Sequence, residues 1–437
     1  MGRRDFVNVI LIAIDTLRAD HLSCDGYYRK TTPTIDSIAS EGVVFEDCIA
    51  PGIPTHPAYT TIFTGLHPLV HKIVCHAGNV QLSWSVKTLP ELLYENGYFT
   101  VAVDNLAATR GLWFTRGFEA YLYSGGITVI SKGAKVSGEI VTERTVNFLR
   151  AWREGVFGRK PLFLFVHYWD PHTPYLPPLG YRERFYEGGG TRLSLLLEKT
   201  RWGRLLLRTE WIRQLISEGH DEKEYVDSLY DEEILYVDWC VSRLIEELKK
   251  LEVYDDSLLI ITADHGEGLG ENNVYYDHHG LYEWDIRVPL IMRSPSILPR
   301  GKRVSGIVTH EDLFPTVLEA VGVRPPKVDG RSLLPLIRNE SEARRFVICV
   351  ENTRMTKRAI RTRRWKLIET LRPDIYGNIA GHLELYDLQK GEKHNLIEEE
   401  RTIAGELMLL MEEWYRRKLG GEPDPLITQP ISLPVPE

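Results

Sequence analysis

The sequence contains several stretches in which side chains that can do chemistry directly follow apolar runs. Asp264 and His265 come after the run at 257–262, where both can turn towards one metal ion, Asp264 through oxygen and His265 through nitrogen. Gly266 gives the backbone the freedom for such a turn. Asp15 follows the run at 7–14, and alone such an Asp is usually a turn former or a helix cap.

Thr55 lies in a loop that is fixed by Gly52 and by three prolines at 51, 54 and 57. Pro57 suits the first turn of a helix, where its missing N–H is not needed. A helix starting here places the Thr55 hydroxyl at a helix N-terminus, beside N–H groups that favour an anion. Thr55 is then either a helix cap or a nucleophile, and the two roles are compatible because both place the hydroxyl at the helix mouth.

Three histidines stand in two further polar turns. His172 follows the run at 162–167 and a proline turn, and His278 and His279 precede a short helical stretch. Histidine in such places acts as a metal ligand, a proton carrier or a donor to an oxyanion. A single loop histidine is more often none of these.

Alternating strands and helices must position these residues. Short apolar, β-branched runs at 7–14, 100–103, 162–167, 257–262 and 288–293 predict strands, and helical periodicity covers 33–41, 57–64, 89–96, 136–154 and 221–250. This alternation predicts an α/β fold with a large, mostly parallel sheet flanked by helices. Because ligands collect beyond the carboxyl ends of such strands, we expect the site at the ends of 7–14 and 257–262.

The pattern changes after residue 308. A helix at 312–321 and a Pro-rich linker precede short strands at 346–351, 358–362, 365–369 and 384–387, and a last helix covers about 402–418. We predict a catalytic domain at 1–340 and a C-terminal α+β subdomain with a small antiparallel sheet and a Pro-rich tail at 341–437.

A basic, Leu-rich insertion at 192–218 carries six Lys or Arg residues against three Glu. It is either a lid facing an anionic substrate or surface, or a surface helical hairpin with solvated arginines, and the hairpin is the more common arrangement.

The composition excludes some classes of protein. With 53 Lys and Arg against 61 Asp and Glu, the 437-residue chain has a formal charge of −8, which argues against a nucleic-acid-binding module. Five cysteines without CxxC spacing fit a reducing compartment. No run is long enough for a membrane span, so we expect a cytoplasmic protein that acts on a small molecule, with a homo-oligomer left open.

The fragments together resemble the sulfatase-like branch of the alkaline phosphatase superfamily over nearly the whole chain. The matching stretches are 15–20, 63–68, 88–97, 170–174, 264–267, 281–283 with 287–289, 329–333 and 384–388. The resemblance implies an alkaline phosphatase-like fold and a metal-dependent ester hydrolase.

The sequence departs from that family at the nucleophile. Sulfatases carry a Cys or Ser that is oxidised to formylglycine, followed by Pro and Arg, whereas here Thr55 is followed by Pro57 and Tyr59. Threonine cannot give the required aldehyde. A Thr here resembles the nucleotide pyrophosphatase/phosphodiesterase relatives, although these usually have Asn where Ala58 stands.

The resemblance implies roles for seven residues. Asp15, Thr55, Asp264 and His265 are expected to hold a divalent ion (Zn²⁺, Mn²⁺ or Ca²⁺). His172 and His278 are expected to contact the substrate and assist the leaving group, with His279 beside them. A second metal site would need Asp170, His172 and one of the other two histidines. One site is favoured, because the spacing between Asp170 and His172 is tighter than in the phosphodiesterase relatives.

The expected function is hydrolysis of phosphate diesters or phosphonate monoesters through a phosphoryl-Thr55 intermediate. Three alternatives remain open: a sulfuric ester hydrolase, a phospho-group transferase, and a silent member that only binds an anionic glycan or nucleotide. The retained residues at 15, 55, 264 and 265 count against the silent member.

Overall fold

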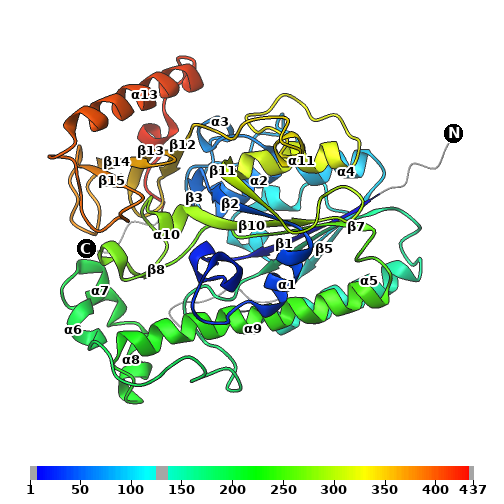
Figure 1. Cartoon of the computed structure of the whole chain (residues 1–437), viewed down its shortest axis with the longest axis horizontal. Coiled ribbons are helices and arrows are strands. Elements are labelled where there is room, and N and C mark those ends of the chain that lie inside the picture. Colours follow the sequence, from blue (N-terminus) through cyan, green and yellow to red (C-terminus); the bar gives the residue numbers. More distant parts are fainter. Residues whose placement is uncertain (1–6, 125–135, 433–437) are drawn as a thin grey trace.

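The computed structural model describes residues 7–124 and 136–432, and its main element is an eight-stranded sheet (Figure 1). The strands in spatial order are β11 (Lys302–Thr309), β2 (Val43–Ile49), β10 (Arg287–Arg293), β7 (Ser257–Thr262), β1 (Asn8–Ile14), β6 (Leu162–Tyr168), β4 (Phe99–Asp104) and β5 (Ala120–Tyr123). Only β10 runs antiparallel to its neighbours, β2 and β7. The predicted α/β class with a mostly parallel sheet is confirmed.

Helices cover both faces of this sheet. One face carries α1 (Pro33–Glu41), α5 (Gly138–Arg153) and α9 (Lys223–Lys250), and the other carries α2 (Thr55–Thr64), α4 (Leu89–Glu95) and α11 (Leu313–Ala320) (Figure 1). Every residue of β6 and β7 is buried. Strands covered on both faces need apolar side chains at successive positions, which is why these runs were recognisable in the sequence.

Three strands of the large sheet were not predicted. β5 and β11 are the two edge strands, and β5 has only four residues. In β2, the half-buried Glu46 and Asp47 interrupt the apolar run. Pairing with β10 and β11 makes this segment a strand, so its tertiary neighbours decide its conformation.

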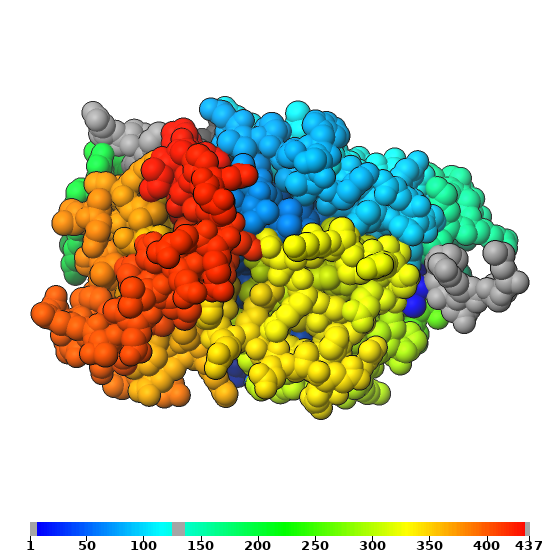
Figure 2. Space-filling model, turned by 90° about the horizontal axis from the view of Figure 1, so that it is seen from above, coloured from blue at the N-terminus to red at the C-terminus, as the bar shows by residue number. Residues whose placement is uncertain are grey.

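A second sheet has the order β15 (Leu383–Asp387), β14 (Trp365–Arg372), β13 (Thr356–Thr362), β12 (Phe346–Glu351) and β3 (Gly52–Ile53). It packs against the terminal helix α13 (Arg401–Leu419). This confirms the small antiparallel sheet, with one addition: β3 comes from the N-terminal part and pairs in parallel with β12. Figure 2 shows the red C-terminal residues lying against blue residues of the N-terminal part. The boundary near residue 340 stays a prediction.

The insertion forms three short helices, α6 (Leu193–Leu197), α7 (Arg201–Leu206) and α8 (Glu210–Ser217), in place of a helical hairpin. Its six basic side chains are exposed, whereas Leu206 and Trp211 are buried. The remaining short elements are α3 (Pro68–His71), β8 (Gly268–Leu269), β9 (Tyr275–Asp277), α10 (Glu283–Ile286), α12 (Leu334–Ile337) and α14 (Pro425–Thr428).

Within the described residues, no helix combines the length and the apolarity that crossing a membrane requires. The last five residues of the predicted Pro-rich tail, 433–437, lie outside the described residues.

Candidate active site

Four neighbouring strands bring reactive side chains to one edge of the large sheet. β7, β1, β6 and β4 are parallel neighbours in this order, so their carboxyl ends lie together. Asp15 follows β1, Asp264 follows β7, His167 lies near the end of β6, and Asp104 ends β4. The topology therefore places these groups side by side where ligands bind in open α/β sheets.

Asp15, Asp264 and His265 converge at one fully buried point and form a group that could hold a metal ion. Nε2 of His265 lies 3.2 Å from Oδ2 of Asp264 and 4.0 Å from Oδ1 of Asp15. Nδ1 of His265 is 2.9 Å from the carbonyl oxygen of Gly266, so Nε2 is the nitrogen that faces the carboxylates.

Three carboxylate oxygens of this group are buried without a hydrogen-bond partner among the described residues: both of Asp15, and Oδ2 of Asp264. Buried carboxylates are unfavourable unless a cation or donors compensate them. This donor set of oxygens and one imidazole nitrogen therefore fits a divalent cation.

His167 and Asp104 hold Asp15 from the other side. Nε2 of His167 lies 3.3 Å from Oδ2 of Asp15, and Nδ1 lies 2.7 Å from Oδ1 of Asp104. Burial acts to lower the pKa of His167, but hydrogen bonds and charge from Asp104 and Asp15 outweigh it and raise that pKa to about 10. His167 therefore lies between the two carboxylates and orients Asp15.

The turns after β1 and β7 are locked together. Thr16 has a φ of 55°, an unfavourable value for a β-branched residue. Its amide donates to Oδ1 of Asp264 at 3.2 Å, and its carbonyl accepts from the Tyr230 hydroxyl at 2.7 Å. A Cβ at Gly266 would stand 1.9 Å from the carbonyl oxygen of Trp284, so only glycine fits there.

Thr55 is the first residue of α2, two positions before the predicted helix start. Its Oγ1 lies 3.4 Å from Nε2 of His265, and the residue is only 3% exposed. The pairing of Ile53 in β3 with Glu351 in β12 fixes the loop just before it. Thr55 thus stands next to the metal-binding group and also lines a cavity.

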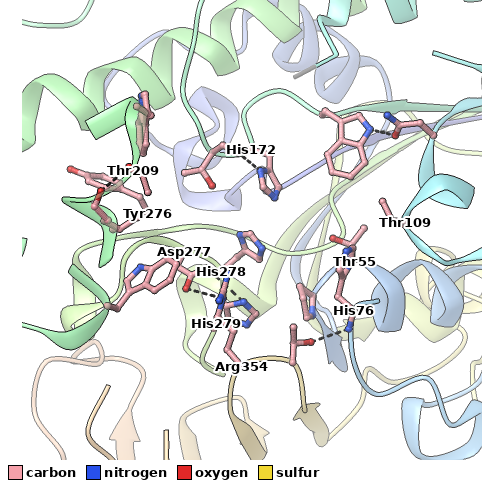
Figure 3. Close-up of a pocket in the computed structure, with 18 residues that line it drawn as sticks. Thr55, His76, Thr109, His172, Thr209, Tyr276, Asp277, His278, His279 and Arg354 are labelled. Atoms are coloured by element: carbon pink, nitrogen blue, oxygen red, sulfur yellow. Dashed lines mark hydrogen bonds and ion pairs between the residues drawn. The ribbon is translucent and has the colours of Figure 1, made fainter. Parts of the chain in front are cut away.

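The cavity has a volume of about 200 Å³ and is rich in imidazole at the Thr55 end (Figure 3). The polar residues that line the cavity include Thr55, His76, Thr109, His172, His278, His279 and Arg354, together with the carboxylate of Asp277. Imidazoles and a guanidinium surrounding one hydroxyl form a site for an anionic group.

His172 and His278 are held close together. Nδ1 of His172 lies 2.6 Å from the carbonyl oxygen of Thr173, and the ring centroids of His172 and His278 are 4.8 Å apart. Burial, followed by the charges of His265 and His172, keeps the pKa of His278 well below its usual value. Burial and the neighbouring imidazoles thus disfavour the protonated form of His278.

His279 is oriented by the C-terminal sheet. Its Nδ1 contacts Oε1 of Glu351 at 2.5 Å, and the other carboxylate oxygen accepts from the Gly280 amide at 2.8 Å. Asp277, His278 and His279 form a second group that could hold a metal ion. However, Asp277 Oδ2 already accepts from the Tyr376 hydroxyl at 2.7 Å.

Asp170, which the sequence offered for a second ion, accepts from the Gly138 amide at 2.8 Å at the start of α5. Its carboxylate therefore takes part in fixing α5, and it is absent from both groups of metal-binding side chains found among the described residues.

Sequence reasoning missed several residues around the cavity. His76 lies in a loop without any pattern, and burial, then His172 and His265, lower its pKa to about 3. Arg354 follows β12, far from every motif, and its Nε lies 3.5 Å from Oδ2 of Asp277. For His167 and Asp104 the signal was their position at strand ends, the same signal that pointed to Asp15.

All seven predicted site residues lie in or beside this cavity. Asp15, Asp264 and His265 form the buried group next to Thr55, while His172, His278 and His279 line the cavity. Their catalytic and metal-binding roles stay predictions.

Comparison with known proteins agrees with this arrangement. The family model described as Sulfatase matches residues 7–323, and one described as N-sulphoglucosamine sulphohydrolase, C-terminal, matches residues 270–414. A relative from Bacteroides thetaiotaomicron named N-acetylglucosamine-6-O-sulfatase is 24% identical, over 95% of this chain and 88% of its own. A multifunctional alkaline phosphatase superfamily protein from Trinickia caryophylli is 26% identical over 76% of this chain and 77% of its own.

Solved structures share the fold. One in complex with D-glucosamine-2-N,6-O-disulfate has a TM-score of 0.73 at 23% identity, covering 96% of this chain and 99% of that one. The phosphonate monoester hydrolase of Agrobacterium radiobacter also has a TM-score of 0.73, at 21% identity, covering 94% and 95%. Because the Sulfatase family model spans residues 7–323, most of the chain, the chain belongs to the sulfatase family of hydrolases.

Proposed function

We propose that this hydrolase cleaves phosphate or phosphonate esters with a divalent metal ion, and that Thr55 is its nucleophile. The observation that carries the proposal is the position of the Thr55 hydroxyl. It lies 3.4 Å from Nε2 of His265, between the buried carboxylates and the imidazole-lined cavity.

Asp15, Thr55, Asp264 and His265 would hold the ion. When bound, a divalent ion favours the alkoxide form of a coordinated hydroxyl and offsets the negative charge of the ester. The helix N-terminus of α2 favours negative charge at the same oxygen.

The identity of residue 55 favours phosphorus over sulfur. A threonine oxidised at Cβ gives a ketone, so the hydrated aldehyde of formylglycine chemistry is inaccessible to this chain. Thr55 therefore offers one hydroxyl, which can form an ester with the substrate's acid group and must be released by a second attack, by water. Phosphoryl transfer to such a hydroxyl and on to water is an established form of covalent catalysis.

In the first step the Thr55 hydroxyl releases its proton to solvent, its oxygen bonds to phosphorus, and the bond between phosphorus and the leaving oxygen breaks. The leaving alkoxide takes a proton, for which His172 is the proposed donor because it lines the cavity. In the second step water supplies the oxygen that replaces Thr55 on phosphorus, and the Thr55 hydroxyl is restored. Arg354 offsets the charge on the oxygens bound to phosphorus in both steps, and the imidazoles of the cavity can donate hydrogen bonds to them.

A sulfate ester is the second candidate substrate. The similarity to relatives named as sulfatases favours it, since the relative from Bacteroides thetaiotaomicron covers 95% of this chain. Sulfate ester hydrolysis would require the enzyme to release sulfate from a sulfated Thr55 without the aldehyde of formylglycine.

Three esters with the same leaving group separate the candidates: bis(4-nitrophenyl) phosphate, 4-nitrophenyl phenylphosphonate and 4-nitrophenyl sulfate, each assayed with Mn²⁺ and with Zn²⁺. We expect a kcat/KM for one of the phosphorus esters at least tenfold above that for the sulfate. A preference for the sulfate would establish the second candidate instead.

The matched variants are Thr55→Ala and Thr55→Ser. We expect Thr55→Ala to lower kcat at least about 10³-fold and Thr55→Ser to keep much of it, since serine retains the hydroxyl. Equal turnover by the Ala variant would show that Thr55 is not the nucleophile. Metal analysis of the purified protein accompanies this assay: we expect one tightly bound ion per chain, and two would contradict the single site.

A further inference from the structure

The end of the cavity opposite Thr55 has a different chemistry. It is lined by Trp202 and Leu206 of α7, Trp211 of α8 and Tyr276 of β9. Figure 3 shows Thr209 and Tyr276 across the cavity from Thr55, with His172 and His278 between them. An ester whose acid group lies at Thr55 can therefore place its leaving group against this apolar wall.

The wall is built by the insertion and is held rigidly. Nε1 of Trp202 donates to the Tyr275 carbonyl at 2.8 Å, and the Arg354 guanidinium stands 4.7 Å from the Trp202 ring centroid. Trp211 packs edge-on against Tyr175 at 5.3 Å and Tyr276 at 5.8 Å. The wall is thus shaped before a ligand arrives, which favours binding because little side-chain ordering remains.

Most polar atoms of the wall are already engaged within the protein. The Thr209 hydroxyl donates to the Leu206 carbonyl at 2.7 Å, and the Tyr276 hydroxyl contacts Asp227 Oδ1 at 3.4 Å. Nε1 of Trp202 is likewise taken. Nε1 of Trp211 is buried without a partner among the described residues, so the wall exposes few polar atoms to a ligand.

This distribution discriminates between leaving groups. A sugar would exchange several hydrogen bonds to water for fewer against this wall, and buried polar groups without partners are unfavourable. A hydrocarbon group loses nothing on leaving water and gains contact with the indoles and Leu206. The six basic side chains of the insertion are exposed, so they do not change the apolar character of the wall.

We propose that the site takes esters of apolar alcohols, with an alkyl, cycloalkyl or aryl leaving group, in preference to esters of sugars. The inference rests on the proposed function for the acid-group end of the cavity. It assigns the choice of leaving group to Trp202, Leu206 and Trp211 of the insertion.

A matched pair of ligands tests the preference by binding. Cyclohexylmethyl phosphate and glucose 6-phosphate both join a six-membered ring to the ester oxygen through one CH₂ group, and they differ chiefly in the ring hydroxyls. Calorimetry with the metal-loaded Thr55→Ala protein gives both affinities, and the corresponding sulfates repeat the comparison with the other acid group. We expect the cyclohexylmethyl ester to bind at least tenfold tighter, and equal or tighter sugar binding would overturn the proposal.

Inorganic phosphate and sulfate, measured alone, separate the two proposals. If an inorganic anion binds but the two esters bind with equal affinity, only the preference for apolar leaving groups is refuted. If neither inorganic anion nor either ester binds, the proposed function fails, and the leaving-group proposal that rests on it falls as well.

Variants of the wall assign the effect to the insertion. Leu206→Ala should weaken binding of the cyclohexylmethyl ester at least tenfold and leave inorganic phosphate within twofold. Trp202→Phe, a milder change at a half-buried position, serves if Leu206→Ala does not fold. The control is Leu195→Ala, at a residue of the same insertion that is 53% exposed, which should change neither affinity. A cyclohexylmethyl affinity that survives in the folded wall variant would contradict the assignment.

Discussion

Arg354 offers a direct test of the anion site, because it comes from the C-terminal region and no motif points to it. It lines the cavity together with His76, His278 and His279. Arg354→Gln keeps the approximate length and polarity of the side chain and removes its charge. We expect weaker binding of any anionic ligand at the Thr55 end of the cavity.

The size of the effect follows from the contacts of Arg354. A hydrogen bond between charged groups contributes about 1.5–3 kcal/mol. Asp277 lies 3.5 Å from Nε and partly offsets the guanidinium charge, which places the expectation towards the lower end. With about 1.4 kcal/mol for each factor of ten, the affinity should fall about 10- to 30-fold. Arg354→Lys, which keeps the charge and loses the planar fork, should fall in between.

The assay measures the inhibition constants of inorganic phosphate and sulfate together with kcat and KM for the preferred ester. The control is Arg364→Gln, because Arg364 belongs to the same part of the chain, has a 53% exposed side chain and pairs with Asp387 at 3.0 Å. An unchanged inhibition constant in a folded Arg354→Gln protein would refute the reasoning, and so would an equal loss in Arg364→Gln.

Two further changes test the buried charges. Asp104→Asn removes the carboxylate that lies 2.7 Å from Nδ1 of His167. We expect calorimetry to show about 10- to 100-fold weaker metal binding. The control, Glu413→Gln on α13, should have no effect. Equal metal affinities in both variants would remove His167 from the support of Asp15. Burial raises the pKa of Glu311 to about 7, although the charge of Arg344 opposes this. The folded state therefore binds this proton more tightly than the unfolded state. As a result, the free energy of unfolding falls as the pH rises towards 7. In urea unfolding, the Glu311→Gln protein should therefore be more stable than wild type at pH 8, by at most about 3 kcal/mol, and no more stable at pH 4. A lower stability of the variant at pH 8 would mean that the ion pair with Arg344 dominates.

The large sheet was predictable where its strands are covered on both faces. β1, β6 and β7 are mostly apolar runs, because their side chains, apart from that of Asn8, are buried. Their carboxyl ends carried the signal for Asp15, Asp264 and His265. The order of these strands makes the three residues neighbours. This order is a property of the folded sheet, and the sequence around each strand does not indicate it.

The C-terminal contribution to the site could not be read from the sequence. Arg354 and Glu351 lie some 300 residues from Thr55, and only the pairing of β3 with β12 brings Glu351 next to the loop before the nucleophile. The insertion illustrates the same limit. Its composition indicated a basic segment, whereas the folded chain exposes those charges and places Trp202, Leu206 and Trp211 in the cavity.

The sequence by itself determined the chemical types at this site: a threonine that cannot become an aldehyde, two carboxylates and several histidines at the ends of recognisable strands. These features are local, because a residue's type and the burial pattern of its strand are written in consecutive positions. The tertiary structure alone decided which of them meet, which carboxylates are left without donors, and which distant arginine and tryptophans complete the cavity. Those properties depend on strand order and on pairings across hundreds of residues, and no spacing along the chain encodes them.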